Sequence, residues 1–300
     1  MTLVLAMILD AVAGEPRWLW NRVPHPAVLI GRAIDWADER FNEGEDRKRN
    51  GVLFCVALCA AAAIIGWVIT ILPFGGLLEL IAAAILLAQR SLVDHVTAVA
   101  DALRLSLGDG RRAVARIVGR DTKDMDEAAV TRAAIESGAE NFSDGVVAPV
   151  FWFAALGLPG LLIYKAVNTA DSMIGHMTPR YARFGWAAAR LDDILNWVPA
   201  RLSALILLAA AGRWADLPLI RGDARLHRSP NAGWPEAAMA LILNVALSGP
   251  RSYDGQMQEF PYVHGDGNRT PGPADIDRAV VMLWRGWTVL LLIAFLLVLI

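Results

Sequence analysis

Long apolar runs alternate with polar blocks along this chain, and the apolar runs set the first expectations. Val52–Leu72 is 21 residues without a charged side chain. At about 1.5 Å of helix per residue, such a run can cross about 30 Å of hydrocarbon. A short uncharged turn, Pro73–Gly76, separates it from a second apolar segment. We therefore expect a helical hairpin over 52–89 and, from the apolar end of the chain, a transmembrane helix over 279–300.

The remaining blocks complete an all-α, multi-pass membrane fold with roughly four to six membrane-embedded helices and additional amphipathic cytoplasmic helices. Apolar residues recur at helical spacing through Ala98–Val118, which predicts one amphipathic helix. Val146–Ile163 is apolar but contains Pro and Gly, so it either crosses the membrane or dips in and returns. We expect a single domain over 1–300, with further segments at 90–145 (cytoplasmic helical), 146–212 (motif-rich membrane or interface core) and 213–278 (cytoplasmic helix and loop).

Composition supports a membrane protein, and no basic run in the sequence indicates nucleic acid as a partner. Charged residues make up 19% of the chain and hydrophobic residues 56%, whereas soluble domains carry about 25% charge. The formal net charge is −2, and no Lys/Arg run is long enough to follow a phosphate backbone. Lys and Arg are frequent in Gly14–Asn50, Gln89–Ser143 and Arg213–Arg228. The positive-inside rule therefore places these blocks in the cytoplasm.

The stretch "ESGAENFSDGVVAP" places carboxylates directly before an apolar run. Glu136 and Glu140 would lie one helical turn apart and repel each other. A cation, a basic partner or solvent must offset that repulsion. The alternative is a solvated helix end capped by Asn141 or Ser143, with Asp144 just beyond it.

The stretch "YKAVNTADSMIGH" places Lys165, Asn168, Asp171 and Ser172 on one helix face. An aspartate can ligate Mg²⁺ while a lysine offsets phosphate charge, so this face suits a magnesium–phosphate group. The alternative is an internal Lys165–Asp171 ion pair that anchors a helix end. Charges beside a membrane are costly, which favours the functional interpretation.

The stretch "FGWAAARLDDILNWVPAR" contains Asp192 and Asn196 at i and i+4, where both could serve one metal. Asp193 would point about 100° away from Asp192. Arg190 and Arg201 flank the motif. The alternative is acidity at a helix start, where the dipole favours it.

The stretch "HRSPNAGWPEAAMA" is explained mostly as a loop followed by a helix start. Pro235 and Glu236 suit a first helical turn. Asn231 and Trp234 are explained less well by that reading. Neither a P-loop nor an H-E-x-x-H motif occurs in the chain.

These motifs, together with "LDAVAGEPRWLWNRVPHPAVLIGRAI" and "GPRSYDG", resemble the adenosylcobinamide-phosphate synthase family, the CobD/CbiB type of cobalamin biosynthesis protein. The resemblance covers nearly the whole chain, with Phe142 as a departure where a smaller polar residue is expected. It implies a ligase of the inner membrane that joins the f propionate of adenosylcobyric acid to (R)-1-aminopropan-2-ol or its O-phosphate. ATP would drive the amide bond. Other membrane enzymes of the late corrin pathway are candidate partners.

Within that resemblance, the chemistry of the side chains suggests roles. We expect Mg²⁺ at carboxylates, namely Asp144, Asp171, Asp192 and Asp193. Catalytic roles are expected for Glu140, Lys165, His176 and Arg190, with Glu140 or His176 as the base. Substrate or ATP contacts are expected from Asn141, Ser143, Asn168, Asn196, Arg201 and Asn231. Asp10, Glu15 and His25 lie in matched motifs without an assigned role.

We expect these groups to converge in one pocket facing the cytoplasm. Two competing interpretations stay open: a non-catalytic corrinoid-binding scaffold or transporter, and a magnesium-dependent membrane phosphotransferase.

Overall fold

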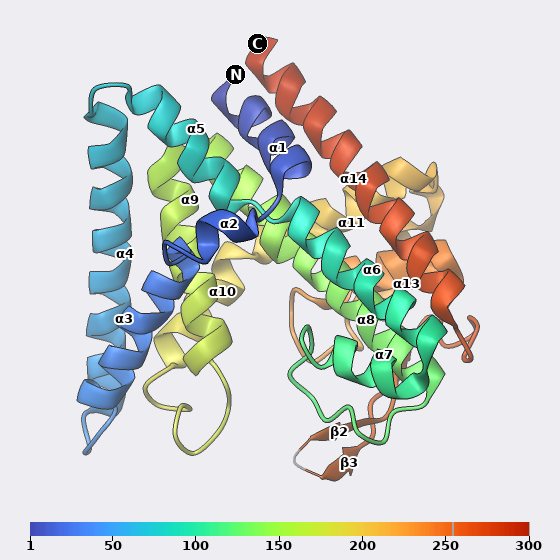
Figure 1. The fold of residues 1–300 in the computed structure, drawn as a ribbon. Helices are drawn as coiled ribbons and strands as arrows, with labels where there is room; N and C mark the ends of the chain where they lie inside the picture. Colours follow the sequence, from blue (N-terminus) through green and yellow to red (C-terminus); the bar gives the residue numbers. More distant parts are fainter. Residues whose placement is uncertain (254, 300) are drawn as a thin grey trace. The chain divides into compact units, whose positions relative to one another are not determined.

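The computed structural model describes residues 1–253 and 255–299 and is predominantly helical (Figure 1). Four helical segments are long and apolar enough to cross a membrane, and a fifth counts if the pair α10–α11, bent by 42°, forms one span. The four are Arg47–Ile71, Gly75–Leu105, Glu127–Ile174 and Pro273–Leu299. The predicted all-α, multi-pass membrane fold is therefore confirmed.

The contacts of the chain group into two compact units, which we describe separately. The first unit contains 1–88 and 148–196 together with the end of the chain, and the second contains 89–147 and 197–297. The expectation of a single domain over 1–300 stays a prediction.

The first unit is built around the predicted hairpin. Helices α4 (Arg47–Ile71) and α5 (Gly75–Leu86) are joined by a short turn, as Figure 1 shows. Both pack against α9 (Ala148–Ile174), and so does α10 (Trp186–Leu195). The remaining helices are α1 (Thr2–Ala13), α2 (Arg17–Trp20) and α3 (Pro26–Phe41).

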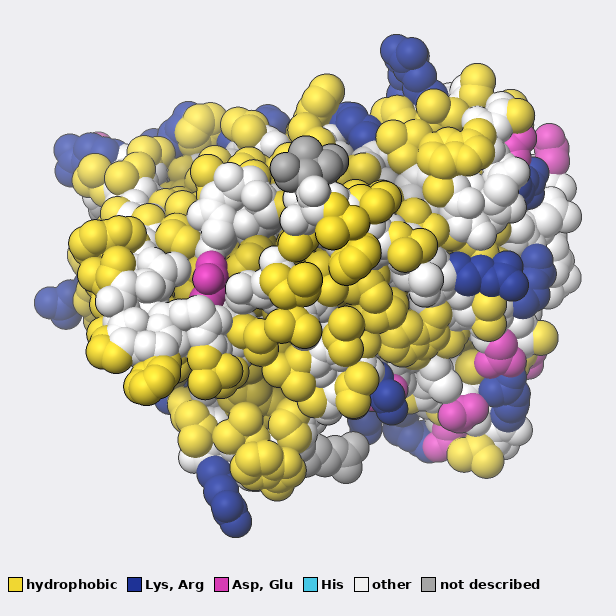
Figure 2. Space-filling view, turned by 90° about the horizontal axis from the view of Figure 1, so that it is seen from above, with side chains coloured by type: hydrophobic (Ala, Val, Ile, Leu, Met, Phe, Trp, Pro, Cys, Tyr) yellow, Lys and Arg dark blue, Asp and Glu magenta, His cyan; other side chains and the backbone are white. Residues whose placement is uncertain are grey.

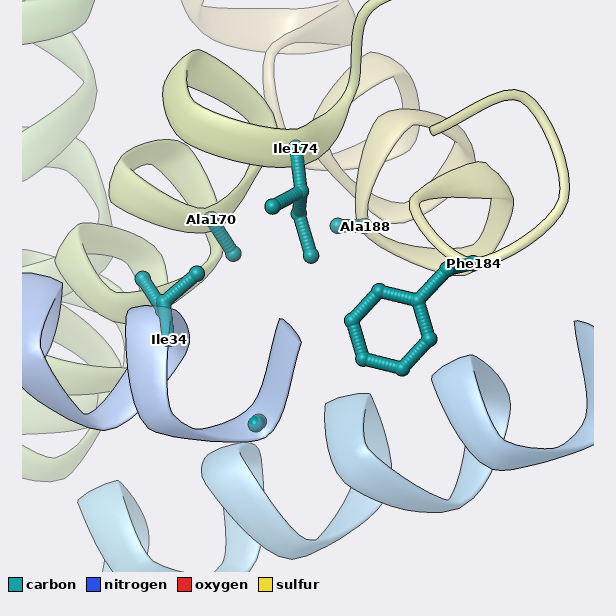
Figure 3. Close-up of a cluster of buried hydrophobic side chains, with 6 residues drawn as sticks. Ile34, Ala170, Ile174, Phe184 and Ala188 are labelled. Carbon is teal, nitrogen blue, oxygen red and sulfur yellow. The ribbon is translucent and has the colours of Figure 1, made fainter. Parts of the chain in front are cut away.

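A small apolar core joins three of these helices. Ile34 of α3, Ala170 and Ile174 of α9, and Ala188 of α10 form one buried cluster with Phe184, which precedes α10 (Figure 3). The backbone carbonyl of Phe184 also touches α4 at Gly51, where a Cβ would clash. The glycine therefore allows a close approach that a larger residue would prevent.

Helix α9 breaks where the sequence contains Gly and Pro. Gly157 adopts φ 66° and ψ −158°, and Pro159 follows two residues later. A positive φ is inexpensive only for glycine, and proline cannot donate the next helical hydrogen bond. The predicted interruption of this apolar segment is thus present.

The second unit differs from the prediction in one helix. The expected single helix through residues 98–118 is instead α6 (Gln89–Leu105) and α7 (Leu107–Val114). Ser106 causes the break, because its hydroxyl accepts a hydrogen bond from the Asp109 amide at 3.0 Å and caps α7.

The rest of the second unit holds the other candidate site residues. Its helices are α8 (Glu127–Phe142), the π-helical turn η1 (Ser143–Val147), α11 (Trp197–Ala211), the 3₁₀ turn η2 (Trp214–Asp216), α12 (Leu217–Ala224), α13 (Gly233–Leu243) and α14 (Pro273–Leu299). Two antiparallel ladders of short strands follow α13: β1 (Leu247–Ser248) with β4 (Tyr262–Val263), and β2 (Arg251–Tyr253) with β3 (Gln256–Gln258).

Many large hydrophobic side chains are exposed, as expected for a protein that faces lipid. Along α4, Leu53, Val56 and Ile64 are each at least 60% exposed. Figure 2 shows hydrophobic side chains over much of one face, with few charged ones among them. A soluble protein rarely exposes so large an apolar surface.

Candidate active site

In the first unit, a buried aspartate is held by amides from two helices. Asp192 lies near the end of α10 and is only 9% exposed. The Asn196 amide donates to its Oδ2 at 3.0 Å, and the Asn168 amide of α9 donates to its Oδ1 at 3.2 Å. The Tyr164 hydroxyl donates to Asn196 Oδ1 at 2.9 Å. These four residues and Asp171 form what we call the carboxylate–amide cluster.

The structure bears on both interpretations of the Asp192 motif. Asp192 and Asn196 lie on one helix face as predicted, but the Asn196 amide donates to Asp192 and its oxygen accepts from Tyr164, so their joint ligation of a metal stays a prediction. Acidity at a helix start is wrong as an explanation, because α10 begins at Trp186 and Asp192 stands near its C-terminal end. The helix dipole disfavours a negative charge there. Asp193 points elsewhere and lies 3.4 Å from Arg190, as expected for adjacent helical residues.

The carboxylates of this cluster suit a Mg²⁺ ion that is bound partly by substrate phosphates, and not one that is bound by protein side chains alone. Asp171 and Asp192 repel each other electrostatically, so a cation between them would be favourable. Among the described residues, no group of three His, Cys, Asp or Glu side chains could hold a metal alone. Mg²⁺ usually takes one or two carboxylates, with waters and substrate phosphates completing its shell.

The other predicted residues of the first unit surround α9. Lys165 is half-buried one turn before Asn168. Ser172 is exposed, and its hydroxyl donates to the Asn168 carbonyl at 2.9 Å. His176 is exposed, two residues after α9 ends.

In the second unit, Glu136 is buried in a network of ions. Its side chain is 5% exposed and its Oε2 accepts from Arg120 at 2.6 Å and lies 3.2 Å from Arg251. Its Oε1 accepts from the Ser248 amide at 2.6 Å. We expected a cation, a basic partner or solvent to offset the repulsion between Glu136 and Glu140, and Arg120 and Arg251 are such cations for Glu136.

The alternative of a solvated helix end capped by Asn141 or Ser143 holds only for the exposure of Glu140 and Asn141. Glu136 is buried, and α8 continues directly into the π-helical turn that contains Ser143 and Asp144. Asn141 does not cap the helix, because its amide donates to the Ser137 carbonyl at 2.9 Å. Ser143 is 1% exposed, whereas Asp144 is partly accessible.

A second carboxyl group lies within the same network. Glu236 is 2% exposed, and its Oε1 lies 3.4 Å from His227 Nε2. Burial raises the pKa of Glu236 well above its usual value, and the charges of Glu136 and Glu140 raise it further. Burial also lowers the pKa of His227, and the charge of Arg251 adds to this. Both shifts favour the neutral forms of the carboxyl group and the imidazole.

We call Arg120, Glu136, His227, Glu236 and Arg251 the buried ion network. Its two arginines and its histidine were not among the candidates from the sequence. Arg251 lies inside the motif "GPRSYDG", which could have indicated it. Arg120 lies in no quoted motif and is 16 residues before Glu136.

Helix α13 begins at Gly233, so Pro235 and Glu236 lie in its first turn as predicted. The two residues of this motif that a helix start does not explain, Asn231 and Trp234, both contact Arg201. The Arg201 guanidinium donates to Asn231 Oδ1 at 3.0 Å. It also lies 4.5 Å from the ring centre of Trp197 and 5.0 Å from that of Trp234. Asn231 and Trp234 therefore position this arginine.

Comparison with known proteins decides the family. The chain matches the family described as "CobD/Cbib protein" over residues 3–283. The chain belongs to the CobD/Cbib protein family. It is 49% identical to "Cobalamin biosynthesis protein CobD" of Rhizobium meliloti (strain 1021), covering 97% of this chain and 94% of the relative. The protein of the same name from Brucella suis biovar 1 (strain 1330) is 50% identical, over 95% and 92%.

A more distant relative of the same name, from Rhodobacter capsulatus, is 46% identical over 94% of this chain and 92% of its own length. No solved structure matches the chain. The CobD/Cbib match covers both the carboxylate–amide cluster and the buried ion network.

Other residues of the CobD/Cbib motifs now have structural explanations. His25 caps α3, because its Nδ1 accepts from the Ala27 amide at 3.1 Å. Asp10 is buried in α1. Phe142 is fully buried, and its ring occupies the space beside Gly286 where a Cβ would clash. Packing therefore explains why a large apolar residue stands at position 142, where the family resemblance suggested a smaller polar one.

Proposed function

We propose that the chain acts in cobalamin biosynthesis as an ATP-dependent amide-forming ligase. It joins the f propionate of adenosylcobyric acid to (R)-1-aminopropan-2-ol or its O-phosphate, and it releases adenosylcobinamide or its phosphate. Membership of the CobD/Cbib family and the names of its relatives support the pathway. The apolar helices support a membrane location. We place the protein in the inner membrane, with its site open to cytoplasmic ATP.

The reaction proceeds in two steps whose atoms balance. A carboxylate is a poor acylating agent, so a propionate oxygen attacks the γ-phosphorus of ATP and ADP leaves. The amine nitrogen then attacks the acyl phosphate, forming the amide bond and releasing phosphate. A base takes the proton that the amine loses.

The observation that carries the proposal is the buried Asp192, fixed by Asn168 and Asn196. Amide donors keep both oxygens of this carboxylate in one orientation, which preorganises it as a ligand. Asp192 and Asp171 would hold Mg²⁺ at the phosphoryl group that is transferred to the propionate, and Lys165 would contact that phosphoryl group. When bound, Mg²⁺ would offset the charge of the transferring phosphoryl group.

The other assignments remain proposals on chemical grounds. Glu140 or His176 would serve as the base, and Arg190 would contribute positive charge. Asp144 and Asp193 are further candidate ligands. Polar contacts to substrate would come from Asn141, Ser143, Asn231 and Arg201.

Purified, detergent-solubilised protein tests this proposal. The Asp171→Asn and Asp192→Asn variants should each lose at least about 100-fold in amide formation, since removing a group that stabilises developing charge costs about that much. Asp35→Asn, at an exposed aspartate of α3 in the same unit, is the matched control and should keep full activity.

Unchanged amide formation in both variants would remove the carboxylate–amide cluster from the site. Corrinoid binding or transport by the wild type without any bond formation would instead support the scaffold or transporter.

A further inference from the structure

A cavity of about 710 Å³ in the second unit has a strongly basic lining. It lies among α11, α12 and the loop that leads to α13. Four arginines line it, Arg201, Arg221, Arg225 and Arg228, and no aspartate or glutamate does so among the described residues. Its volume is within the range of pockets for small ligands.

The acidic residues next to these arginines are engaged elsewhere. Asp216 pairs with Arg213 at 2.6 Å, and Asp223 accepts from the His264 amide at 3.0 Å. Among the described residues, no hydrogen bond or ion pair involves the side chains of Arg221, Arg225 and Arg228. Positive charge is therefore concentrated in the cavity without protein counterions.

One arginine of the cavity is held in place by the protein. Arg201 donates to Asn231 and to the Trp197 carbonyl, the latter at 2.6 Å, and lies over the rings of Trp197 and Trp234. These contacts leave it fewer rotamers to lose when it meets a ligand, which favours binding. His227 also lines the cavity, where its Nδ1 accepts from the Ser229 amide at 3.0 Å.

We propose that this cavity binds the triphosphate of a nucleotide. Arginine guanidinium groups match phosphate oxygens in bidentate geometry. A triphosphate carries about four negative charges at neutral pH and can meet several guanidinium groups along its length. A single phosphate would leave part of the lining unneutralised, and like charges would then repel each other.

This inference rests on the proposed function, because ATP is its expected nucleotide. It goes further by assigning the nucleotide to α11, α12 and the loop before α13, through Arg221, Arg225 and Arg228. None of these three residues was a candidate from the sequence.

Equilibrium binding to the full-length protein in neutral detergent tests it, with ATP and inorganic tripolyphosphate as probes. Arg221→Gln and Arg225→Gln should each weaken both probes by about tenfold or more, as expected for a lost charge-assisted hydrogen bond. Arg116→Gln, at an exposed arginine outside the cavity in the same unit, should change neither affinity. Because both changed side chains are exposed, the variants should fold normally.

Equal affinities of ATP in the wild type and both variants would overturn the inference. The inference would also be overturned if ATP fails to bind while phosphatidylglycerol nanodiscs, but not phosphatidylcholine nanodiscs, displace tripolyphosphate. The assay separates this inference from the proposed function. Arginine-dependent ATP binding without amide formation would contradict the function alone, whereas amide formation with an unchanged KM for ATP in both variants would contradict the cavity alone.

Discussion

Replacing Glu136 with glutamine should strongly destabilise the protein. Glutamine keeps the shape and an oxygen that can accept from the Ser248 amide. However, it removes the negative charge shared by Arg120 and Arg251, whose side chains are 8% and 14% exposed. Two nearly buried guanidinium groups would then lose the negative charge of Glu136. Breaking a buried pair in this way costs about 3–5 kcal/mol.

This cost corresponds to a measurable shift in melting temperature. For a chain of this size, about 1 kcal/mol corresponds to about 2 °C, so the Tm should fall by roughly 6–10 °C. Thermal unfolding of the purified protein in one detergent, at one heating rate, measures the shift. Glu259→Gln is the matched control, because Glu259 is exposed in the same unit, and it should change the Tm by less than about 1 °C.

A double variant sharpens the test. If Arg120 and Glu136 stabilise each other, Arg120→Gln combined with Glu136→Gln should cost less than the sum of the single changes. A Tm for Glu136→Gln equal to that of the Glu259→Gln control would refute the reasoning.

Three further changes have defined outcomes. Because the pKa of Glu236 is raised from 4.5, its stabilising contribution is complete below about pH 4.5 and is lost as the pH rises through the raised pKa. Glu236→Gln, which resembles the protonated acid, should therefore flatten the decline of Tm as the pH rises above about 4.5, and an unchanged slope would contradict this. Gly51→Ala should lower the Tm by at least about 2 °C through overpacking, whereas Gly76→Ala, with nothing within 4 Å of its added Cβ, should not. Tyr164→Phe leaves the buried Asn196 oxygen without its donor and should cost about 1–3 kcal/mol by chemical denaturation, so a cost below about 0.5 kcal/mol would count against the hydrogen bond.

Hydropathy and turn residues were sufficient to predict most of the fold. The uncharged run from Val52 and the turn at Pro73–Gly76 gave the α4–α5 hairpin, and Gly157 with Pro159 gave the break in α9. The helix expected through residues 98–118 was wrong in one respect. Its apolar spacing continues past Ser106, but the hydroxyl of that serine starts a new helix.

The candidate site was predictable only where its residues are near in sequence. Asp192 and Asn196 share a helical turn, so their pairing follows from spacing. The sequence indicated that Glu136 needs a cation nearby, but it did not identify Arg251, which lies on β2 after α13. Hydrophobic periodicity carries no information about such a contact, because it depends on how the elements pack. For the same reason, the basic cavity of α12 could not be recognised in the sequence.

Product analysis of the purified wild-type protein tests the central claim most directly. The protein would be incubated with adenosylcobyric acid, MgATP and either (R)-1-aminopropan-2-ol or its O-phosphate, and the corrinoids would be identified by mass spectrometry. We expect adenosylcobinamide or its phosphate to form in equal amounts with ADP, and only when ATP is present. If adenosylcobyric acid is recovered unchanged after incubation with each amine, although the protein still binds the corrinoid, the assignment as a ligase would be contradicted.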